Sequence, residues 1–437
     1  MFPVPSARLV VAAAVMAVVV LVAPLPTPWG FVAAIGVLAA AGGADVLLAP
    51  DPSDVGIVRD APSTVTLGSA GAEVSWRITN PVGRVLHVAV ADELAPSLRP
   101  GTRRVRVAVP PHGTITARTG LDPTRRGRFE PGEVVVRVDG PLGLMARQRR
   151  RSLAGVIRVL PVFRSRKEAE LRVERAQLLE VGLRSARARG SGTEFDSLRD
   201  YTVDDDVRRI DWAATARSRR AVVRTYRAER NQQVVVLLDN GRVMAGQVGG
   251  VPRIEWAMDA AMALTTVATR LGDRCGLVTF DRTVRSVVPP AAGPSQLRRV
   301  TDALYDLEPQ LVESDYGGAF ATTVARFRRR AMLVLVTELV EEAMTDTLVP
   351  ALPLLLARHV VVVASVSDPD VARWAAAAPA DVASAYRTAA AVAAVGRRSR
   401  AEGLLEGLGA GVVDAPPDAL AARLADAYLR VKAAGRL

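Results

Sequence analysis

Two apolar runs lie at the start of the chain. Leu9–Ala23 carries no charge, and after a proline-rich turn a second run extends from Trp29 to Ala49, interrupted only by Asp45. A membrane-spanning helix needs about 17 to 25 apolar residues, so the pattern predicts two transmembrane helices joined as a hairpin over 1–50. Asp45 lies near the end of its run, where a structural role is favoured over an intramembrane functional one.

The flanking charges predict the orientation of this hairpin. Arg8 precedes the first run and the turn carries no charge, which places both termini in the cytoplasm by the positive-inside rule. A secretory signal peptide is the alternative, but Val22-Ala23-Pro24 lacks the small-residue pattern of a cleavage site. We therefore expect a multi-pass protein of the cell (inner) membrane, with its large C-terminal part in the cytoplasm.

Residues 51–163 show a different periodicity. Apolar and polar residues alternate over short segments separated by proline and glycine, which is typical of strands. The clearest segments are Glu73–Thr79, Val85–Val90, Arg103–Val109 and Glu133–Val138. The pattern predicts a β-rich module, a small sandwich of generally immunoglobulin-like shape.

Residues 164–230 begin with a charged stretch, Arg164–Arg189, in which leucines recur near helical spacing. Leu171, Leu178, Leu179 and Leu183 predict the apolar face of a connector helix.

Residues 231–437 alternate apolar strands with helices, which predicts a mostly parallel sheet covered on both faces, a doubly wound α/β domain. The expected strands are Gln232–Leu238, Cys275–Phe280, Thr283–Val288, Ala331–Thr337 and His359–Val366, and the expected helices are Arg253–Leu271, Ser295–Leu307, Gly317–Arg329 and Leu420–Ala433. The predicted architecture is thus multidomain.

Composition narrows the classes of function. The 437 residues are 49% hydrophobic and carry a net charge of +12, and all basic residues except Lys167 and Lys432 are arginine. This bias resembles a genome-wide coding preference, so the charge is poor support for nucleic-acid binding. Basic clusters at 125–128 and 147–151 are better interpreted as a face toward anionic lipid headgroups. A single cysteine, Cys275, excludes an internal disulfide.

A dense polar block follows Gly190-Ser-Gly192. Carboxylates, arginines and two aromatic residues interleave there, a composition that favours a network of arginine–carboxylate pairs docking against a neighbouring domain. A calcium loop is a weaker alternative because the spacing fails at Arg208 and Arg209. The residues we select from this block are Arg199, Tyr201, Asp205, Arg208, Asp211, Trp212 and Arg217.

The order G-x-x-F-x-x-L-R-x-Y, then D-D-x-R-x-I-D-W-x-x-x-A-R, resembles a bacterial family known as domain of unknown function fifty-eight. The resemblance extends from the hairpin to at least Glu338, with Asp204 where the family usually has glycine. Members resemble membrane-anchored von Willebrand A-type proteins commonly encoded beside MoxR-type AAA+ ATPases. The resemblance therefore implies a von Willebrand A-like domain and, as partners, such an ATPase and other membrane-complex proteins.

The strand ends of the C-terminal domain are similar to a degenerate metal-ion-dependent adhesion site (MIDAS). Asp239 stands at the leading position of D-x-S-x-S, but Gly241 and Val243 replace both serines, while Ser314 stands for threonine and Glu338 for aspartate. Mg²⁺ prefers hard oxygen ligands of this kind. We take Asp239, Ser314 and Glu338 as candidate metal ligands, expect no obligatory cofactor, and expect recognition of a partner through polar contacts.

Together these patterns predict a non-enzymatic, membrane-anchored scaffold or adaptor in complex assembly or envelope homeostasis. One alternative is a hydrolase using the carboxylates of the dense block, although neighbouring arginines lower carboxylate pKa values and disfavour a general acid. Another is a basic protein that binds nucleic acid or anionic lipid. We expect no nucleic-acid role because aromatic residues are sparse among the basic clusters.

Overall fold

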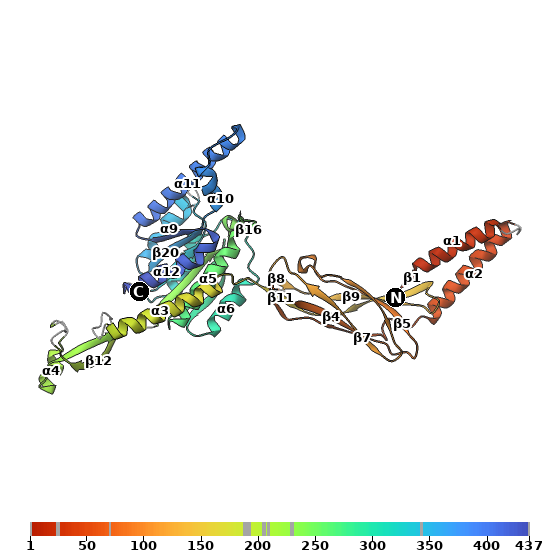
Figure 1. Cartoon of the computed structure of the whole chain (residues 1–437), viewed down its shortest axis with the longest axis horizontal. Coiled ribbons are helices and arrows are strands. Elements are labelled where there is room, and N and C mark those ends of the chain that lie inside the picture. The colour runs from red at the N-terminus through yellow and green to blue at the C-terminus, as the bar shows by residue number, and fades with distance from the viewer. Residues whose placement is uncertain are drawn as a thin grey trace. The chain divides into compact units, whose positions relative to one another are not determined.

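The computed structural model describes residues 2–22, 27–69, 71–186, 194–202, 207, 210–227, 231–340 and 344–435. The chain divides into two compact units, Met1–Leu160 and Pro161–Leu437. Figure 1 shows the first as two helices and a strand-rich module, and the second as an α/β domain with a separate hairpin of strands.

The apolar runs form two helices, α1 (Ala7–Val22) and α2 (Thr27–Leu48), which lie against each other (Figure 1). Among the described residues, only Trp29–Leu48 is long and apolar enough to cross a membrane. At about 1.5 Å per residue, the 16 residues of α1 reach about 24 Å, short of a hydrocarbon core of about 30 Å. The structure therefore has one candidate span where the sequence predicted two.

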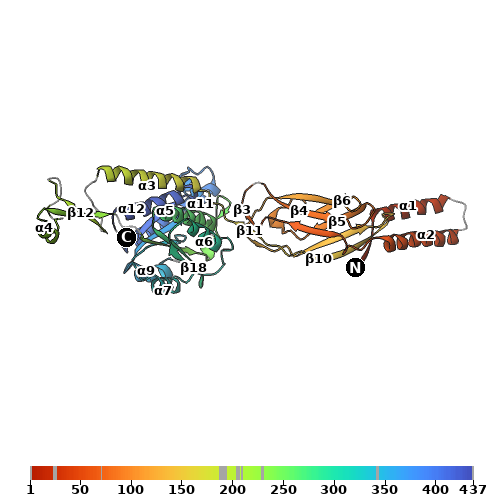
Figure 2. The same ribbon diagram turned by 90° about the horizontal axis from the view of Figure 1, so that it is seen from below.

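The strand-rich module contains a five-stranded sheet, a three-stranded sheet and a small three-stranded sheet at one end (Figure 2). Their strand orders are β1 (Phe2–Pro5), β10 (Met145–Ser152), β9 (Glu133–Asp139), β5 (Leu86–Asp92), β6 (Arg104–Val109); β2 (Gly56–Asp60), β4 (Ala72–Thr79), β7 (Thr114–Leu121); and β3 (Thr64–Thr66), β11 (Ile157–Leu160), β8 (Gly127–Phe129). Alternate residues from both larger sheets, including Trp76, Val88 and Val136, fill one core.

The basic run 147–151 does not form a single solvated face. Residues 147, 149 and 151 share one side of β10, because side chains alternate along a strand. Arg147 Nη1 donates to the carbonyl of Ala49 over 2.8 Å, and Arg151 Nη1 donates to the carbonyl of Val55. These two arginines hold the segment between α2 and β2, whereas Arg149 and Arg150 are exposed. The lipid-facing role of the run stays a prediction.

The C-terminal unit is built on a six-stranded sheet with the order β18-β17-β14-β19-β20-β21, in which only β18 is antiparallel to its neighbour. The strands are β14 (Gln233–Asp239), β17 (Arg274–Phe280), β18 (Val284–Ala291), β19 (Met332–Val336), β20 (Val360–Val366) and β21 (Gly411–Ala415), with a small pair β15 (Gln247–Val248) and β16 (Val251–Pro252). Most predicted bounds agree within two residues.

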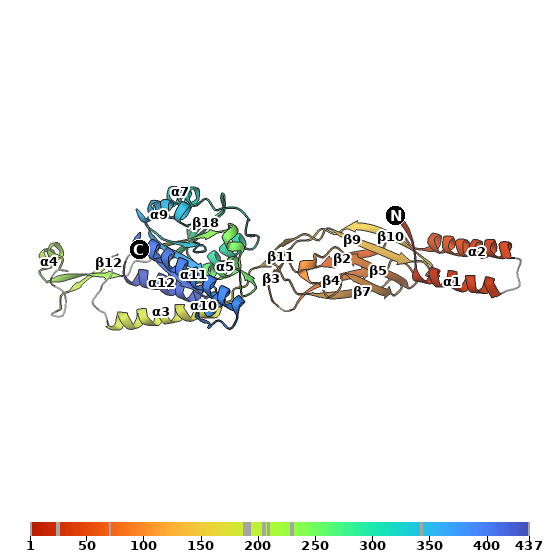
Figure 3. The same ribbon diagram turned by 90° about the horizontal axis from the view of Figure 1, so that it is seen from above.

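Helices cover both faces of this sheet (Figure 3). One face packs against α3 (Arg166–Ala186), α5 (Arg253–Arg270), α6 (Ser295–Leu304) and α12 (Pro417–Ala433). The other packs against α7 (Tyr316–Arg326), α9 (Val349–Leu356) and α11 (Val382–Gly407), and α10 (Pro369–Ala376) lies beside α11. The predicted doubly wound α/β arrangement is confirmed.

The connector helix α3 is present, but two of the four predicted leucines do not face the domain. Ala169 and Val173 are buried against the domain, whereas Leu171 and Leu178 are exposed. The side chains of Leu179 and Leu183 lie outside what the structure describes.

Candidate functional site

Three loops at the carboxyl edge of the sheet meet at the carboxylate of Asp239, the last residue of β14. Ser314 Oγ donates to Asp239 Oδ1 over 2.5 Å. Tyr316 Oη and Thr337 Oγ1 donate to Oδ2 over 2.8 and 2.6 Å. The backbone N–H of Gly241 donates to Oδ1 over 2.8 Å. Each carboxylate oxygen thus accepts two hydrogen bonds.

Glycine is required at position 241 by this close packing. A Cβ there would lie 2.1 Å from Ser314 Oγ and 3.0 Å from the carbonyl oxygen of Val312. The next residue, Arg242, donates its backbone N–H to that same Val312 carbonyl over 3.0 Å. Gly241, which stands where the adhesion-site pattern has serine, therefore allows the loop after β14 to pack closely against the loop before α7.

Tyr316 is the largest member of this cluster and was not among the residues we selected from the sequence. Its ring is buried and packs edge-on against Phe280, with 5.7 Å between ring centroids. Burial, together with the charge of Asp239, raises the pKa of the Tyr316 hydroxyl well above its usual value. The phenol therefore remains protonated and donates to Asp239 at all physiological pH values.

This arrangement does not fit a resident Mg²⁺. A divalent cation of this kind is usually held through carboxylate and hydroxyl oxygens that are free to coordinate it. Here the cluster has one carboxylate, and both of its oxygens are already occupied by protein donors. Across the described residues, no group of three or more His, Cys, Asp or Glu side chains could hold a metal ion.

Glu338, the third predicted ligand, belongs to a different cluster. Its Oε1 accepts from Arg398 Nη1 over 2.6 Å, and its Oε2 lies 3.0 Å from Arg253 Nε. Arg398 also donates to both oxygens of Asp414 over 2.6 Å each, and to Ser365 Oγ over 2.7 Å. Glu338 thus takes no part in the hydrogen bonds around Asp239, and Arg398 ties α11 to Glu338 after β19 and to Asp414 in β21.

The charge balance of this second cluster favours permanent ion pairs. Burial alone would lower the pKa of the Arg398 guanidinium, but the carboxylates of Asp414 and Glu338 outweigh that effect and raise it. The bidentate contact with Asp414 is the strong arrangement for arginine and carboxylate. Arg398 was missed from the sequence because it lies 60 residues from Glu338, and no local motif marks it.

The dense polar block forms a two-stranded hairpin and a short helix. β12 (Glu194–Asp200) pairs with β13 (Val222–Arg227), and α4 (Trp212–Ser218) lies between them in the chain. Arg199 lies in β12, and Tyr201 pairs its backbone N–H with the carbonyl of Ala221 over 2.7 Å.

The selected residues of the block are only partly described. Asp205 and Arg208 lie outside the described residues. Asp211 caps α4, because its Oδ1 accepts the N–H of Ala214 over 2.9 Å. Trp212 and Arg217 are exposed on α4. The docking network predicted for this block therefore stays a prediction, although Asp211 has a local capping role that the sequence analysis did not assign.

The single cysteine of the sequence is buried. Cys275 in β17 is fully inaccessible, and burial raises the pKa of its thiol to about 12. A thiol in this state is a poor nucleophile.

Part of this chain matches a known protein family. The family described as "Protein of unknown function DUF58" matches residues 197–387. The matched residues include most of the block hairpin, the Asp239 cluster and Glu338.

Curated relatives also match part of this protein. Uncharacterized proteins of Mycobacterium tuberculosis and Mycobacterium bovis are each 28% identical over 182 residues, which is 41% of this chain and 56% of theirs. The chain thus spans little more than half the length of these relatives.

Solved structures similar to the chain include two proteins of Bacteroides. BatB of Bacteroides thetaiotaomicron is 18% identical, with 32% of this chain and 69% of that chain covered and a TM-score of 0.27. An aerotolerance-related membrane protein of Bacteroides fragilis is 18% identical, covering 31% and 67%, with a TM-score of 0.27. The SpRpn10 VWA domain is 13% identical, covering 44% and 93%, with a TM-score of 0.27.

Proposed function

We propose that this protein is a membrane-anchored, non-enzymatic scaffold whose von Willebrand A-like domain binds a protein partner at the carboxyl edge of its sheet. The observation that carries the proposal is the saturated carboxylate of Asp239. Four donors from three loops hold it in a fully buried position, so it fixes the loops that form this edge. A group with no free oxygen is poorly suited to acid–base chemistry or to metal binding.

The loops that carry this cluster expose both apolar and charged side chains. Leu311 is 82% exposed on the loop that leads to Ser314, and Val340 is exposed beyond β19. Arg242 Nη2 and Glu313 Oε1 form an exposed ion pair of 2.7 Å between the two interlocked loops. Apolar residues rimmed by charged pairs are typical of sites that bind proteins.

Anchoring to the membrane is supported by α2 and by its connection to the strand-rich module. The candidate span Trp29–Leu48 ends at the segment that Arg147 and Arg151 hold. Arg8, in the first turn of α1, supports an orientation with the domains in the cytoplasm. In this proposal α2 is the membrane anchor.

The proposed partner is a MoxR-type AAA+ ATPase, as the family resemblance implies, and the setting is assembly of a membrane complex or envelope homeostasis. A cytoplasmic ATPase would reach a cytoplasmic carboxyl edge. Recognition would not need Mg²⁺ as a bridging ion because Asp239 is already satisfied within the protein.

Affinity capture of the tagged full-length protein from gently solubilised membranes tests this proposal. Parallel arms contain Mg²⁺ or EDTA, and co-purifying proteins are identified by mass spectrometry. Leu311→Asp places a charge on the proposed surface. Leu354 is an exposed residue of α9 in the same domain, and Leu354→Asp is the matched control.

Enrichment of a MoxR-type ATPase that Leu311→Asp abolishes and Leu354→Asp preserves is the expected result, with equal recovery in both arms. Since an ATPase needs Mg²⁺ for nucleotide binding, the EDTA comparison is repeated with purified partner without nucleotide. Absence of the ATPase from every arm would overturn the partner, and loss of binding in the nucleotide-free EDTA arm would overturn the metal-independent surface.

A further inference from the structure

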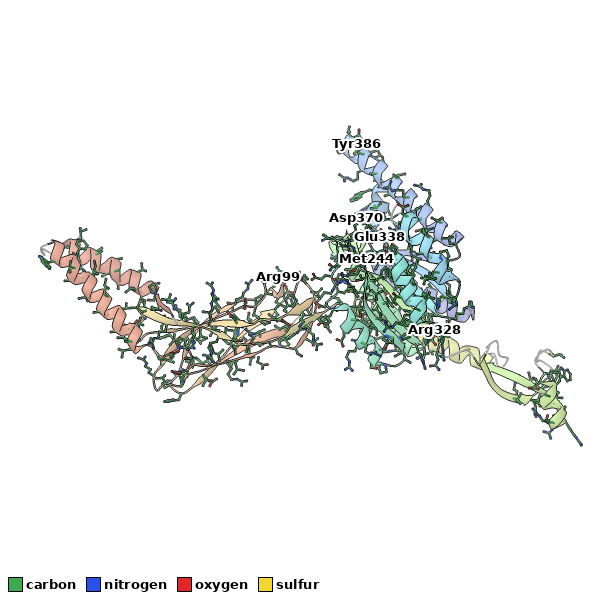
Figure 4. All side chains as sticks on the ribbon, turned by 180° about the vertical axis from the view of Figure 1, so that it is seen from behind. Arg99, Met244, Arg328, Glu338, Asp370 and Tyr386 are labelled. Carbon is green, nitrogen blue, oxygen red and sulfur yellow. The ribbon has the colours of Figure 1, made fainter. Side chains whose placement is uncertain are left out.

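The amino-terminal part of α11 has a solvent-facing apolar side that the fold does not use. The helix is held to the domain through Ala401 and Leu405, which are buried in the core beside β19 and β20. Toward its start it packs against α10. Figure 1 shows α11 extending beyond the sheet with α10 beside it, and Tyr386 lies far from Glu338 in Figure 4.

The exposed side follows helical spacing. Val382, Ala385, Ala389, Val392 and Gly396 are separated by three and four residues in turn, the pattern of a helix–helix seam. Val382 and Val392 are 74% and 53% exposed, and the neighbouring Tyr386 is 76% exposed. Ala391, on the opposite side of the helix, is buried. Arg387 is the single charged residue in Val382–Gly396, which leaves a continuous apolar side facing solvent.

We propose that a second copy of this chain packs against this side, with the two α11 helices antiparallel about a twofold axis at Ala389. A twofold interface uses the same patch on both copies, so the patch must complement itself. Residues three positions from the axis then face residues four positions from it on the other copy. Tyr386 of one copy packs on Ala393 of the other, and Val392 of one copy packs on Ala385 of the other.

The charges at the two ends of the patch complement each other only when the two helices are antiparallel. Asp381 caps the start of α11, and the exposed Arg397 follows its apolar part. An antiparallel pair brings the acidic end of one copy to the basic end of the other. A parallel pair would instead bring like charges together. Each α/β domain is attached to the carboxyl-terminal part of its own α11. In an antiparallel pair of helices, the two α/β domains would therefore lie at opposite ends.

The inference goes beyond the proposed function, because it concerns self-assembly and needs no ATPase. Purified full-length protein in membranes without other proteins is therefore sufficient to test it. The chain offers a favourable background for cysteine cross-linking, since its one native cysteine, Cys275, is fully buried. An engineered cysteine on α11 would be the accessible thiol.

Ala389→Cys places a thiol on the proposed axis, where it meets its own copy. Ala383→Cys, an exposed alanine on the flank of the same helix, is the matched control. After mild oxidation we expect roughly tenfold more disulfide-linked dimer from Ala389→Cys, because only thiols within a few ångströms can join. Equal yields from the two variants would overturn the proposal.

A second variant separates docking from folding. Adding Tyr386→Asp to Ala389→Cys should lower the dimer yield roughly tenfold, through a charge placed against apolar residues of the other copy. Tyr386 is exposed, so the thermal unfolding temperature should remain that of Ala389→Cys alone. An unchanged dimer yield would overturn the proposed occupant.

Discussion

The hydroxyl of Tyr316 lies 2.8 Å from Asp239 Oδ2 and donates a hydrogen bond to it from a buried position. Tyr316 Oη also lies 3.0 Å from Thr337 Oγ1, which donates to the same carboxylate oxygen. One aromatic side chain thus links the ends of β14 and β19 with the start of α7.

Tyr316→Phe should weaken this part of the domain. The substitution removes one of four donors to a buried charge and leaves the ring in place, which costs about 1 to 3 kcal/mol. Hydrogen exchange of the β14 amides measures the change locally. Tyr386→Phe, at an exposed tyrosine, should stay within about 0.5 kcal/mol of the wild type. Identical protection in the Tyr316 variant would contradict the assigned role.

Arg398→Met should have a larger effect. It preserves side-chain length but leaves Glu338 and Asp414 without their shared cation, and breaking such a buried pair costs about 3 to 5 kcal/mol. Faster hydrogen exchange in α11 and β21 is the expected readout. Arg397→Met changes the exposed neighbour and serves as the control. If both variants behave alike, the Arg398 cluster does not hold α11.

Asp45→Asn tests the connection between α2 and the strand-rich module. Asp45 is fully buried and accepts the backbone N–H groups of Leu142, Leu144 and Met145 over 2.7 Å each. An amide of the same shape turns an NH₂ group toward these donors, which costs about 1 to 3 kcal/mol. Exchange of the Leu144 and Met145 amides should accelerate. The exposed Asp54→Asn should leave it unchanged, and parity between the two variants would argue against this anchor.

Asp211→Ala should loosen the start of α4. Loss of an N-cap side chain costs about 1 kcal/mol, which corresponds to roughly fivefold faster exchange of the Ala214 amide when exchange follows local opening. Asp211→Ser retains a capping oxygen and should restore most of the protection. Equal hydrogen exchange in the alanine variant and the wild type would contradict the capping role.

Asp259→Asn should change how stability depends on pH. Burial raises the pKa of the Asp259 carboxyl above its usual value, although the N–H of Ser165 donates to it. The folded state therefore binds a proton more tightly than the unfolded state, and the wild type loses stability as pH rises from about 4 through the folded pKa. Asparagine does not titrate, so the stability difference, variant minus wild type, should grow with pH.

Calorimetry of both proteins across this pH range measures the difference. Asp302→Asn, at an exposed carboxylate on α6, is the control. A difference that shrinks as pH rises would contradict the direction of the Asp259 shift.

The sequence was most informative where periodicity alone sets local structure. Unbroken Val and Leu runs predicted β14 and β19, because strands buried on both faces have no polar side. Asp239 was identified correctly as a strand-end residue for the same reason. The apolar helix Trp29–Leu48 was equally visible, since its length and composition need no tertiary information.

Side-chain direction at the strand ends was decided by the tertiary structure. Thr337 and Glu338 are adjacent, yet Thr337 contacts Asp239 while Glu338 pairs with Arg253 and Arg398. Neighbouring residues in extended chain point to opposite sides, so one of the two had to leave the cluster, and sequence could not say which. Ser314 and Tyr316, on either side of the residue that caps α7, both reach Asp239.

The sequence by itself thus determined which segments are strands, helices and a candidate membrane span, because these depend on composition and spacing within a few residues. The tertiary structure decided which polar groups meet. The partners of Glu338 and Asp45 lie 60 and about 100 residues away, and a buried charge takes the nearest available donors in space. No local pattern records that choice, since it is made when the sheet, helices and loops pack.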